Sequence, residues 1–166
     1  GAIGRMVMQR LQGWDCKLIY SDPYRMPEEM EKKLNCEYVS LETLLRESDV
    51  VSLHCPLTEQ TRGMIGKEQL AMMKPNAIIV NEARGAVIDD KALVEALQNG
   101  TIWGAAIDTW EKEPLDPNDP LVKMEKVITT SHLGAATRET VIRCFSIGYQ
   151  NILRQIHGDE LVNRIV

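Results

Sequence analysis

Apolar residues along the chain fall into two kinds of pattern. In the first segment Ile3, Val7 and Leu11 recur every three to four residues, which is the spacing of one helix face, and Gly13 follows as a stop. The short apolar run at 17–20 predicts a strand. The same alternation then predicts helices over 28–34, 41–46, 67–72, 90–98 and 137–157, and strands over 50–53, 77–80, 102–107 and 127–129.

Short, nearly continuous apolar strands separated by helices are typical of a parallel sheet covered on both faces, because right-handed crossovers place helices above and below it. The pattern therefore predicts a doubly wound α/β fold of the Rossmann type. The proline-containing stretch 113–120 is expected to be a loop. A chain of this architecture should open with a strand, whereas this sequence opens with a helix pattern, so we expect the first strand to lie upstream of Gly1.

Composition narrows the possible functions. The chain has 166 residues, of which 44% are hydrophobic, enough for the core of one domain. A net charge of -5 gives no basic surface for nucleic acid. No run approaches the roughly 20 apolar residues that span a bilayer, and the first ten residues do not resemble a signal peptide. We therefore expect a soluble cytoplasmic protein that contacts neither nucleic acid nor membrane.

The four cysteines, at positions 16, 36, 55 and 144, lie far apart and form no C-x-x-C pair. This spacing gives no support for a zinc site or dithiol chemistry, and we expect reduced thiols and no bound metal. Cys55 precedes Pro56 and either lines a ligand pocket or is a small buried apolar side chain, and the second interpretation is favoured.

The opening residues Gly1-Ala2-Ile3-Gly4 match the second half of the dinucleotide-binding motif G-x-G-x-x-G. In that motif Gly1 would let the backbone approach a pyrophosphate, Gly4 would let the helix pack closely on the sheet, and the helix N-terminus would offer free N–H groups to the phosphates. Half of the motif by itself fits equally well with a glycine pair at a helix start.

Asp22 strengthens this interpretation because it follows the next predicted strand about 20 residues later, where an acidic side chain accepts the ribose hydroxyls of a dinucleotide. A carboxylate there also repels a 2′-phosphate. Although Arg25 is near in sequence, the arrangement favours NAD over NADP. The alternative is that Asp22 is simply a turn residue before Pro23.

Three further segments resemble the D-isomer-specific 2-hydroxyacid dehydrogenases. Residues 80–89, VNEARGAVID, resemble the family signature N-x-A-R-G-x-x-V/I-D. Residues 104–115, GAAIDTWEKEPL, are similar to G-A-A-x-D-V-F-x-x-E-P-L, and residues 130–137, TSHLGAAT, to T-P-H-L/I-G-A/G-x-T. The resemblance runs from Gly1 to about His157, and the phosphoglycerate dehydrogenase-like members are the most similar.

The resemblance implies a catalytic trio of Arg84, Glu113 and His132. Arg84 would hold the substrate carboxylate through paired N–H donors. His132 would take up and return the proton of the substrate hydroxyl, and Glu113 would orient its imidazole. Glu111 competes with Glu113 on spacing alone, but the family pattern marks the residue before the proline.

The resemblance also implies the cofactor contacts. Asp108 matches the residue that meets the nicotinamide carboxamide, and the loop 52–61 borders the adenosine side. His54 lies beside the cofactor pocket, and both it and His157 are interpreted as structural histidines. The full predicted set of cofactor-binding residues is Gly1, Ala2, Ile3, Gly4, Asp22, His54, Cys55, Pro56, Glu82, Ala83, Arg84, Asp108, His132, Gly134 and Ala135.

The sequence departs from the family pattern at three places. Thr109-Trp110 replaces Val-Phe, Ser131 replaces the proline before the histidine, and Glu82 replaces a small or hydroxyl residue. Glu82 matters most, because it either adds an acid beside the cofactor, which would disfavour a highly anionic substrate, or simply turns to solvent.

By this resemblance, residues 1–157 are a dinucleotide-binding domain and 158–166 begin a return toward a substrate domain formed mostly by preceding chain. We expect residues 1–166 alone to bind NAD weakly and turn over poorly, and the protein to be a homodimer. The implied reaction is NAD-dependent hydride transfer to or from C2 of a small 2-hydroxyacid or 2-oxoacid. One alternative is the oxidation of formate or phosphite, although Glu113 argues against formate. The other is a non-catalytic corepressor that senses NAD.

Overall fold

The computed structural model describes residues 1–163, and these divide into a compact unit Gly1–Ser131 and a second unit that starts at His132. In the first unit the elements are, in chain order, α1 (Ala2–Arg10), β1 (Leu18–Tyr20), α2 (Glu28–Leu34), β2 (Cys36–Tyr38), α3 (Leu41–Glu47), β3 (Val50–Leu53), α4 (Lys67–Met72), β4 (Ile78–Asn81), the 3₁₀ turn η1 (Gly85–Val87), α5 (Asp90–Gln98), β5 (Gly104–Ile107), the 3₁₀ turn η2 (Pro120–Lys123) and β6 (Val127–Thr129). The second unit contains α6 (Arg138–His157).

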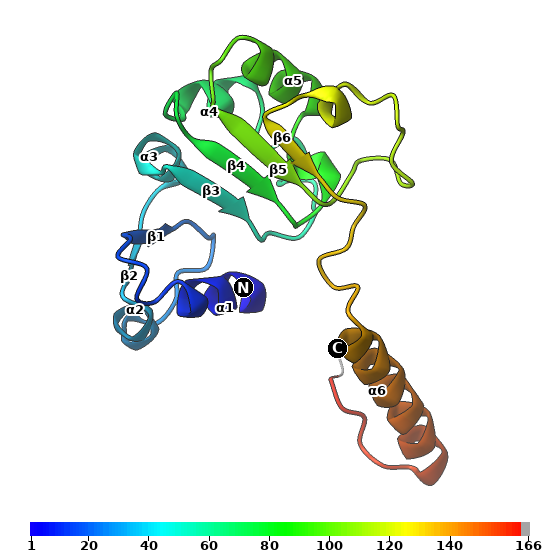
Figure 1. Cartoon of the computed structure of the whole chain (residues 1–166). Helices are drawn as coiled ribbons and strands as arrows, with labels where there is room; N and C mark the ends of the chain where they lie inside the picture. The colour runs from blue at the N-terminus through cyan, green and yellow to red at the C-terminus, as the bar shows by residue number, and fades with distance from the viewer. Residues whose placement is uncertain (164–166) are drawn as a thin grey trace. The chain divides into compact units, whose positions relative to one another are not determined.

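Every strand pair is parallel, which confirms the predicted α/β class. Four strands form one sheet in the order β3-β4-β5-β6, side by side in Figure 1, and β1 pairs with β2 in a separate sheet beside α2. The strands thus form two parallel sheets where the pattern suggested one. In a doubly wound fold the first strand lies between the second and the fourth. That place falls between β1 and β3 in this chain, and these two strands do not pair with each other in the described residues.

The predicted helices and strands match the structure closely, and capping explains where several helices begin. The Ser40 hydroxyl accepts the N–H of Thr43 at the start of α3, and the Asp89 carboxylate accepts two N–H groups at the start of α5. The strand β2 was not predicted, because Cys-Glu-Tyr carries no apolar run. The strand β5 begins at Gly104, two residues later than predicted.

The core lies between the larger sheet and the helices α3, α4 and α5, which neighbour one another in sequence order. Along β3 and β4 alternate side chains are buried, as on a sheet with one face against helices. The fully buried side chains include Leu45, Leu70, Ile79 and Leu93. This core fixes the carboxyl ends of β3, β4 and β5, where the predicted site residues follow.

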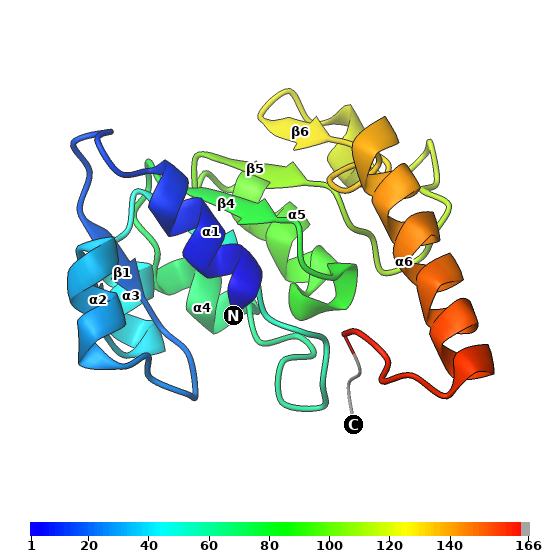
Figure 2. The same ribbon diagram turned by 90° about the horizontal axis from the view of Figure 1, so that it is seen from below.

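The edge between the two sheets is less well covered. The helix α1 buries none of its residues, and Ile3 on it is 64% exposed. Val50, at the start of β3, is 58% exposed. Figure 2 shows α1 and the β1–α2 group from below.

In the second unit the hydroxyl of Thr137 caps α6 and Gly158, with φ of 77°, ends it. The helix thus ends where the sequence predicted. Of the predicted return segment 158–166, residues 164–166 lie outside the described residues. Across residues 1–163, none of the helices combines the length and the apolar character needed to cross a bilayer.

Candidate active site

The loop after β4 is held in place by one buried side chain. Asn81 is 1% exposed. Its Nδ2 donates to the carbonyl of Arg84 at 3.0 Å, and its Oδ1 accepts the N–H of Ala83 at 3.0 Å. The exposed Arg84 side chain folds back so that Nη1 donates to the Ala83 carbonyl at 2.6 Å. Asn81 therefore fixes the backbone from which the predicted substrate-binding arginine projects.

Gly85 brings this loop against the loop after β5. A Cβ at Gly85 would lie 2.1 Å from the backbone nitrogen of Glu111 and 2.1 Å from the carbonyl carbon of Trp110. Side-chain atoms do not approach backbone so closely, so only glycine fits. The backbone next to Arg84 thus packs directly on the loop that carries Glu113.

In the loop after β5, the backbone of Trp110 contacts Glu113 and its indole contacts the end of β6. The Trp110 N–H donates to Oε1 of Glu113 at 3.2 Å, and the buried Trp110 indole Nε1 donates to the Thr130 carbonyl at 2.8 Å. Glu111 instead forms an exposed ion pair with Arg62, with 3.6 Å between Oε1 and Nη1. The two acidic candidates of this loop therefore have different partners, and Glu113 is the one held by the loop that packs on the Arg84 segment.

Asp108 links the ends of three strands. Its N–H donates to the Asn81 carbonyl at 3.0 Å, and the Thr130 hydroxyl donates to its Oδ1 at 2.5 Å. The side chain is 7% exposed. The carboxyl ends of β4, β5 and β6 are thus tied together at the edge where parallel sheets bind ligands.

His132 lies two residues after Thr130 and is the first residue of the second unit, with a φ of 57°. The predicted contacts Gly134 and Ala135 belong to the same unit. The structure thus brings the Arg84 and Glu113 loops together, while the relation of His132 to them stays a prediction.

The predicted dinucleotide end forms a second group in the first unit. The Gly1 nitrogen lies 3.6 Å from Oδ2 of Asp22, whose Oδ1 accepts the Tyr24 N–H at 2.9 Å. In the described residues no atom lies within 4 Å of a Cβ built on Gly1. A Cβ on Gly4 would meet the His54 ring at 3.6 Å, which is ordinary contact. Gly4 therefore faces His54, not sheet backbone.

The loop after β3 lies beside the same group, because the His54 ring faces Gly4. Burial lowers the pKa of the half-buried His54 imidazole, and the negative charge of Glu82 opposes that shift. Burial raises the pKa of the Cys55 thiol, and the charge of Asp22 adds to the rise. Glu82 is exposed, and its charge acts on His54. Its effect on a cofactor or substrate stays a prediction.

Two open hollows of about 490 Å³ each lie away from these groups, around Gly13, Lys17 and Asn35 and around Arg25, Glu31 and Cys36. None of the predicted site residues lines either hollow. Within residues 1–163, no three His, Cys, Asp or Glu side chains are grouped to hold a metal ion.

The sequence analysis missed three residues that shape the site: Asn81, Gly85 and Thr130. All three stand in the recognised motifs, beside residues that were assigned roles, so the motifs themselves carried the signal. Thr109, a departure from the family pattern, is 1% exposed, and its hydroxyl has no hydrogen-bond partner within the described part of the chain.

Known proteins of one family resemble this chain in sequence and in structure. The family model for the NAD binding domain of D-isomer specific 2-hydroxyacid dehydrogenases matches residues 1–134. A glyoxylate reductase of Korarchaeum cryptofilum is 47% identical over all of this chain and 51% of its own length. A D-3-phosphoglycerate dehydrogenase of Methanocaldococcus jannaschii is 42% identical over all of this chain and 31% of its own length.

Among solved structures, the D-lactate dehydrogenase with NAD+ from Lactobacillus jensenii superposes with a TM-score of 0.91 and 32% identity, over all of this chain and 53% of that one. The chain thus spans about half the length, or less, of the relatives it matches. The chain belongs to the D-isomer specific 2-hydroxyacid dehydrogenase family, whose NAD-binding domain it matches.

Proposed function

We propose that this protein is an NAD-dependent dehydrogenase that interconverts a small D-2-hydroxyacid and its 2-oxoacid, with Arg84, Glu113 and His132 as catalytic residues. The observation that carries the proposal is the packing of the Arg84 loop on the Glu113 loop through Gly85, at the carboxyl ends of adjacent strands. This brings a carboxylate-binding guanidinium and an acid onto one edge, where a substrate anion and a proton-transferring histidine are needed.

Each residue has a distinct task in this mechanism. Arg84 binds the substrate carboxylate through two parallel N–H donors and polarises the neighbouring carbonyl. His132 gives a proton to the carbonyl oxygen during reduction and removes it from the hydroxyl during oxidation. The task proposed for Glu113 is to orient the imidazole and to stabilise its protonated form. NAD, when bound, supplies the hydride acceptor or, in reduced form, the donor.

The residues at the start of α1 fit a dinucleotide. The space beside Gly1 is open, and the Asp22 carboxylate lies 3.6 Å from the Gly1 nitrogen. The α1 N-terminus would hold the pyrophosphate, and Asp22 would accept the ribose hydroxyls. His54, Cys55 and Pro56 would border the adenosine, and Glu82, Ala83, Asp108, Gly134 and Ala135 the nicotinamide half.

The relatives favour a small 2-oxoacid as the substrate. Several are named as glyoxylate reductases or glyoxylate/hydroxypyruvate reductases. The charge of Glu82 would oppose a more highly anionic acid, such as a phosphorylated one, because like charges close together repel. All these relatives are named as enzymes, which leaves the corepressor alternative without support.

The two separate sheets support a preceding segment that belongs to the domain. A strand inserted between β1 and β3 would join them into one sheet in the doubly wound order. It would also cover the exposed Val50 and the apolar face of α1 that includes Ile3. We propose that residues 1–157 form one dinucleotide-binding domain with such a strand, and that 158–166 lead toward a substrate domain.

Turnover by the full-length protein tests the proposed function. NADH consumption is followed by absorbance with a panel of 2-oxoacids that includes glyoxylate, hydroxypyruvate, pyruvate and phosphohydroxypyruvate. We expect the fastest oxidation with one of the small, singly charged acids. Absence of NADH oxidation with every acid, in a preparation that binds NADH, would overturn the enzymatic proposal.

His132→Ala tests the catalytic assignment. Loss of the proton-transferring group should lower kcat by about 10²- to 10⁴-fold while the Kd for NADH stays close to that of the wild type. His157→Ala, at the end of α6, is the matched control and should leave kcat unchanged. A His132→Ala protein that loses NADH binding but not kcat would make His132 a structural residue.

A further inference from the structure

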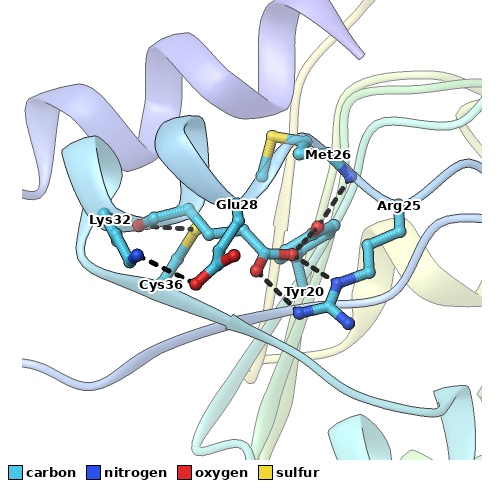
Figure 3. Close-up of polar contacts among 7 residues, drawn as sticks. Tyr20, Arg25, Met26, Glu28, Lys32 and Cys36 are labelled. Atoms are coloured by element: carbon cyan, nitrogen blue, oxygen red, sulfur yellow. Dashed lines mark hydrogen bonds and ion pairs between the residues drawn. The ribbon is translucent and has the colours of Figure 1, made fainter.

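A second group of polar contacts lies directly after Asp22, on the segment that joins β1 to α2. Nε and Nη2 of Arg25 donate to the two carboxylate oxygens of Glu31, each at 2.9 Å. The Tyr20 hydroxyl donates to the same carboxylate at 2.6 Å and accepts the Met26 N–H at 2.9 Å. Figure 3 shows the Arg25 guanidinium turned toward α2, with dashed lines marking these contacts.

Aromatic rings add to the hold on the guanidinium. The Cζ atom of Arg25 lies 5.4 Å from the centre of the Tyr38 ring, within the range of a cation–π contact. The Tyr38 ring in turn packs edge-on against Tyr20, with ring centres 5.4 Å apart. Two rings and one carboxylate therefore fix the position of the Arg25 head group.

The pair is unequal in burial, and this makes it costly to separate. The Glu31 side chain is 9% exposed and that of Arg25 is 60% exposed. If the guanidinium left, the nearly buried carboxylate would keep the Tyr20 hydroxyl but lose both Arg25 donors, and burying a charge without its partner is unfavourable. The Arg25 hydrogen bonds hold the pKa of Glu31 at about 2, so Glu31 carries its negative charge at neutral pH.

Arg25 is the only basic residue between Asp22 and Glu31. In dinucleotide-binding folds an arginine near this position accommodates the 2′-phosphate of NADP. A 2′-phosphate would therefore have to compete with Glu31 for the guanidinium, in addition to facing the charge of Asp22.

We propose that Glu31 is a cofactor-specificity residue: it retains the Arg25 guanidinium on its own carboxylate, withholds it from a 2′-phosphate, and so favours NAD over NADP. This inference rests on the proposed dinucleotide binding, and it assigns the discrimination to a residue on α2 that acts through Arg25. Asp22 repels the phosphate, whereas Glu31 removes the group that would attract it.

The test measures the Kd of NADH and of NADPH for the full-length protein, from the fluorescence of the reduced nicotinamide. Glu31→Gln keeps an acceptor for the Tyr20 hydroxyl and removes the charge that retains Arg25. We expect it to tighten NADPH binding on the order of tenfold, as a hydrogen bond between charged groups does, and to change the Kd of NADH by less than about twofold. Glu28→Gln, which removes a carboxylate of the same helix paired with Lys32, is the matched control and should change neither Kd.

A double variant keeps the test decisive. Arg25→Met combined with Glu31→Gln removes both charges together, so it should bind NADPH as weakly as the wild type does. The proposal is overturned if Glu31→Gln binds NADH normally and NADPH no better than the wild type. It is equally overturned if the double variant binds NADPH severalfold more weakly than the wild type, because Arg25 would then already serve the phosphate. A wild-type protein that binds neither dinucleotide would instead overturn the proposed function.

Discussion

Replacing Gly85 with alanine should separate the two loops that carry Arg84 and Glu113. The new Cβ would lie 2.1 Å from the Glu111 nitrogen and from the Trp110 carbonyl carbon, and 2.6 Å from the Trp110 oxygen. An unstrained contact needs about 3.4 Å, so the loops would have to move apart by more than 1 Å. The neighbouring atoms are backbone and cannot turn away as a flexible side chain would.

The surroundings of Trp110 determine how much stability Gly85→Ala should cost. Its side chain is buried, its N–H is bonded to Glu113, and its indole is bonded to the Thr130 carbonyl. Moving this backbone would strain those bonds as well, so the cost falls at the upper end for overpacking, about 3 kcal/mol. For a chain of this size that lowers the melting temperature by roughly 6 to 12 °C. Since the Arg84 loop shifts, kcat/KM for the 2-oxoacid should fall further than the Kd of NADH rises.

Thermal unfolding and steady-state kinetics of the full-length protein check both effects. Gly148→Ala is the matched control, because a Cβ there meets nothing within 4 Å and alanine favours the helix interior of α6. It should leave kcat/KM unchanged and raise the melting temperature slightly. A Gly85→Ala protein with the melting temperature and kcat/KM of the wild type would refute the close packing of the two loops.

Two further substitutions test other features of the first unit. Thr109→Val replaces a buried hydroxyl that has no partner in the described residues by a methyl group of similar size. It should stabilise the protein by about 1 kcal/mol and raise the melting temperature by roughly 2 to 4 °C. A lower melting temperature would show that the hydroxyl is hydrogen-bonded. The pKa of Asp90 is raised from 3.8 to about 6, first by burial and then by the charges of Asp119, Glu111 and Asp89. Because the pKa of Asp90 is higher in the folded than in the unfolded protein, ionisation of Asp90 lowers the free energy of unfolding as pH rises from about 4 through about 6. The melting temperature of Asp90→Asn should therefore rise relative to that of the wild type across this interval. An equal difference in melting temperature at pH 4 and at pH 7 would contradict this.

Most of the fold could be predicted because each element carries its own local signal. Gly13 follows closely after the end of α1, and the caps Ser40, Asp89 and Thr137 stand where the helix starts were expected. The strand β2, which begins at Cys36, was not predicted because its three residues are too few to show a periodic pattern. The division of the strands into two sheets was also not predicted, because it depends on which strands pair with each other and not on the sequence of any single strand.

The sequence predicts catalytic residue types, whose roles stay proposals, but it does not predict the residues that support them. The motifs marked Arg84 and Glu113, and the structure adds the physical reason for their neighbours: Asn81 satisfies the loop backbone, and Gly85 leaves room for Trp110. Such roles depend on the close approach of segments distant in sequence. In the same way, the sequence placed Arg25 near Asp22, but the hold of Glu31 on its guanidinium is seen in the structure alone.

Thr130 connects these supports to the predicted acid–base residue. Its hydroxyl donates to Asp108 and its carbonyl accepts the Trp110 indole, so the end of β6 is bonded both to the predicted nicotinamide contact and to the loop that holds Glu113. The chain reaches His132 two residues later. These two hydrogen bonds of Thr130 therefore couple the end of β6, which precedes His132, to Asp108 and to the loop that carries Glu113. A family motif that keeps a threonine two residues before its histidine has, in this chain, a structural reason that does not involve the substrate.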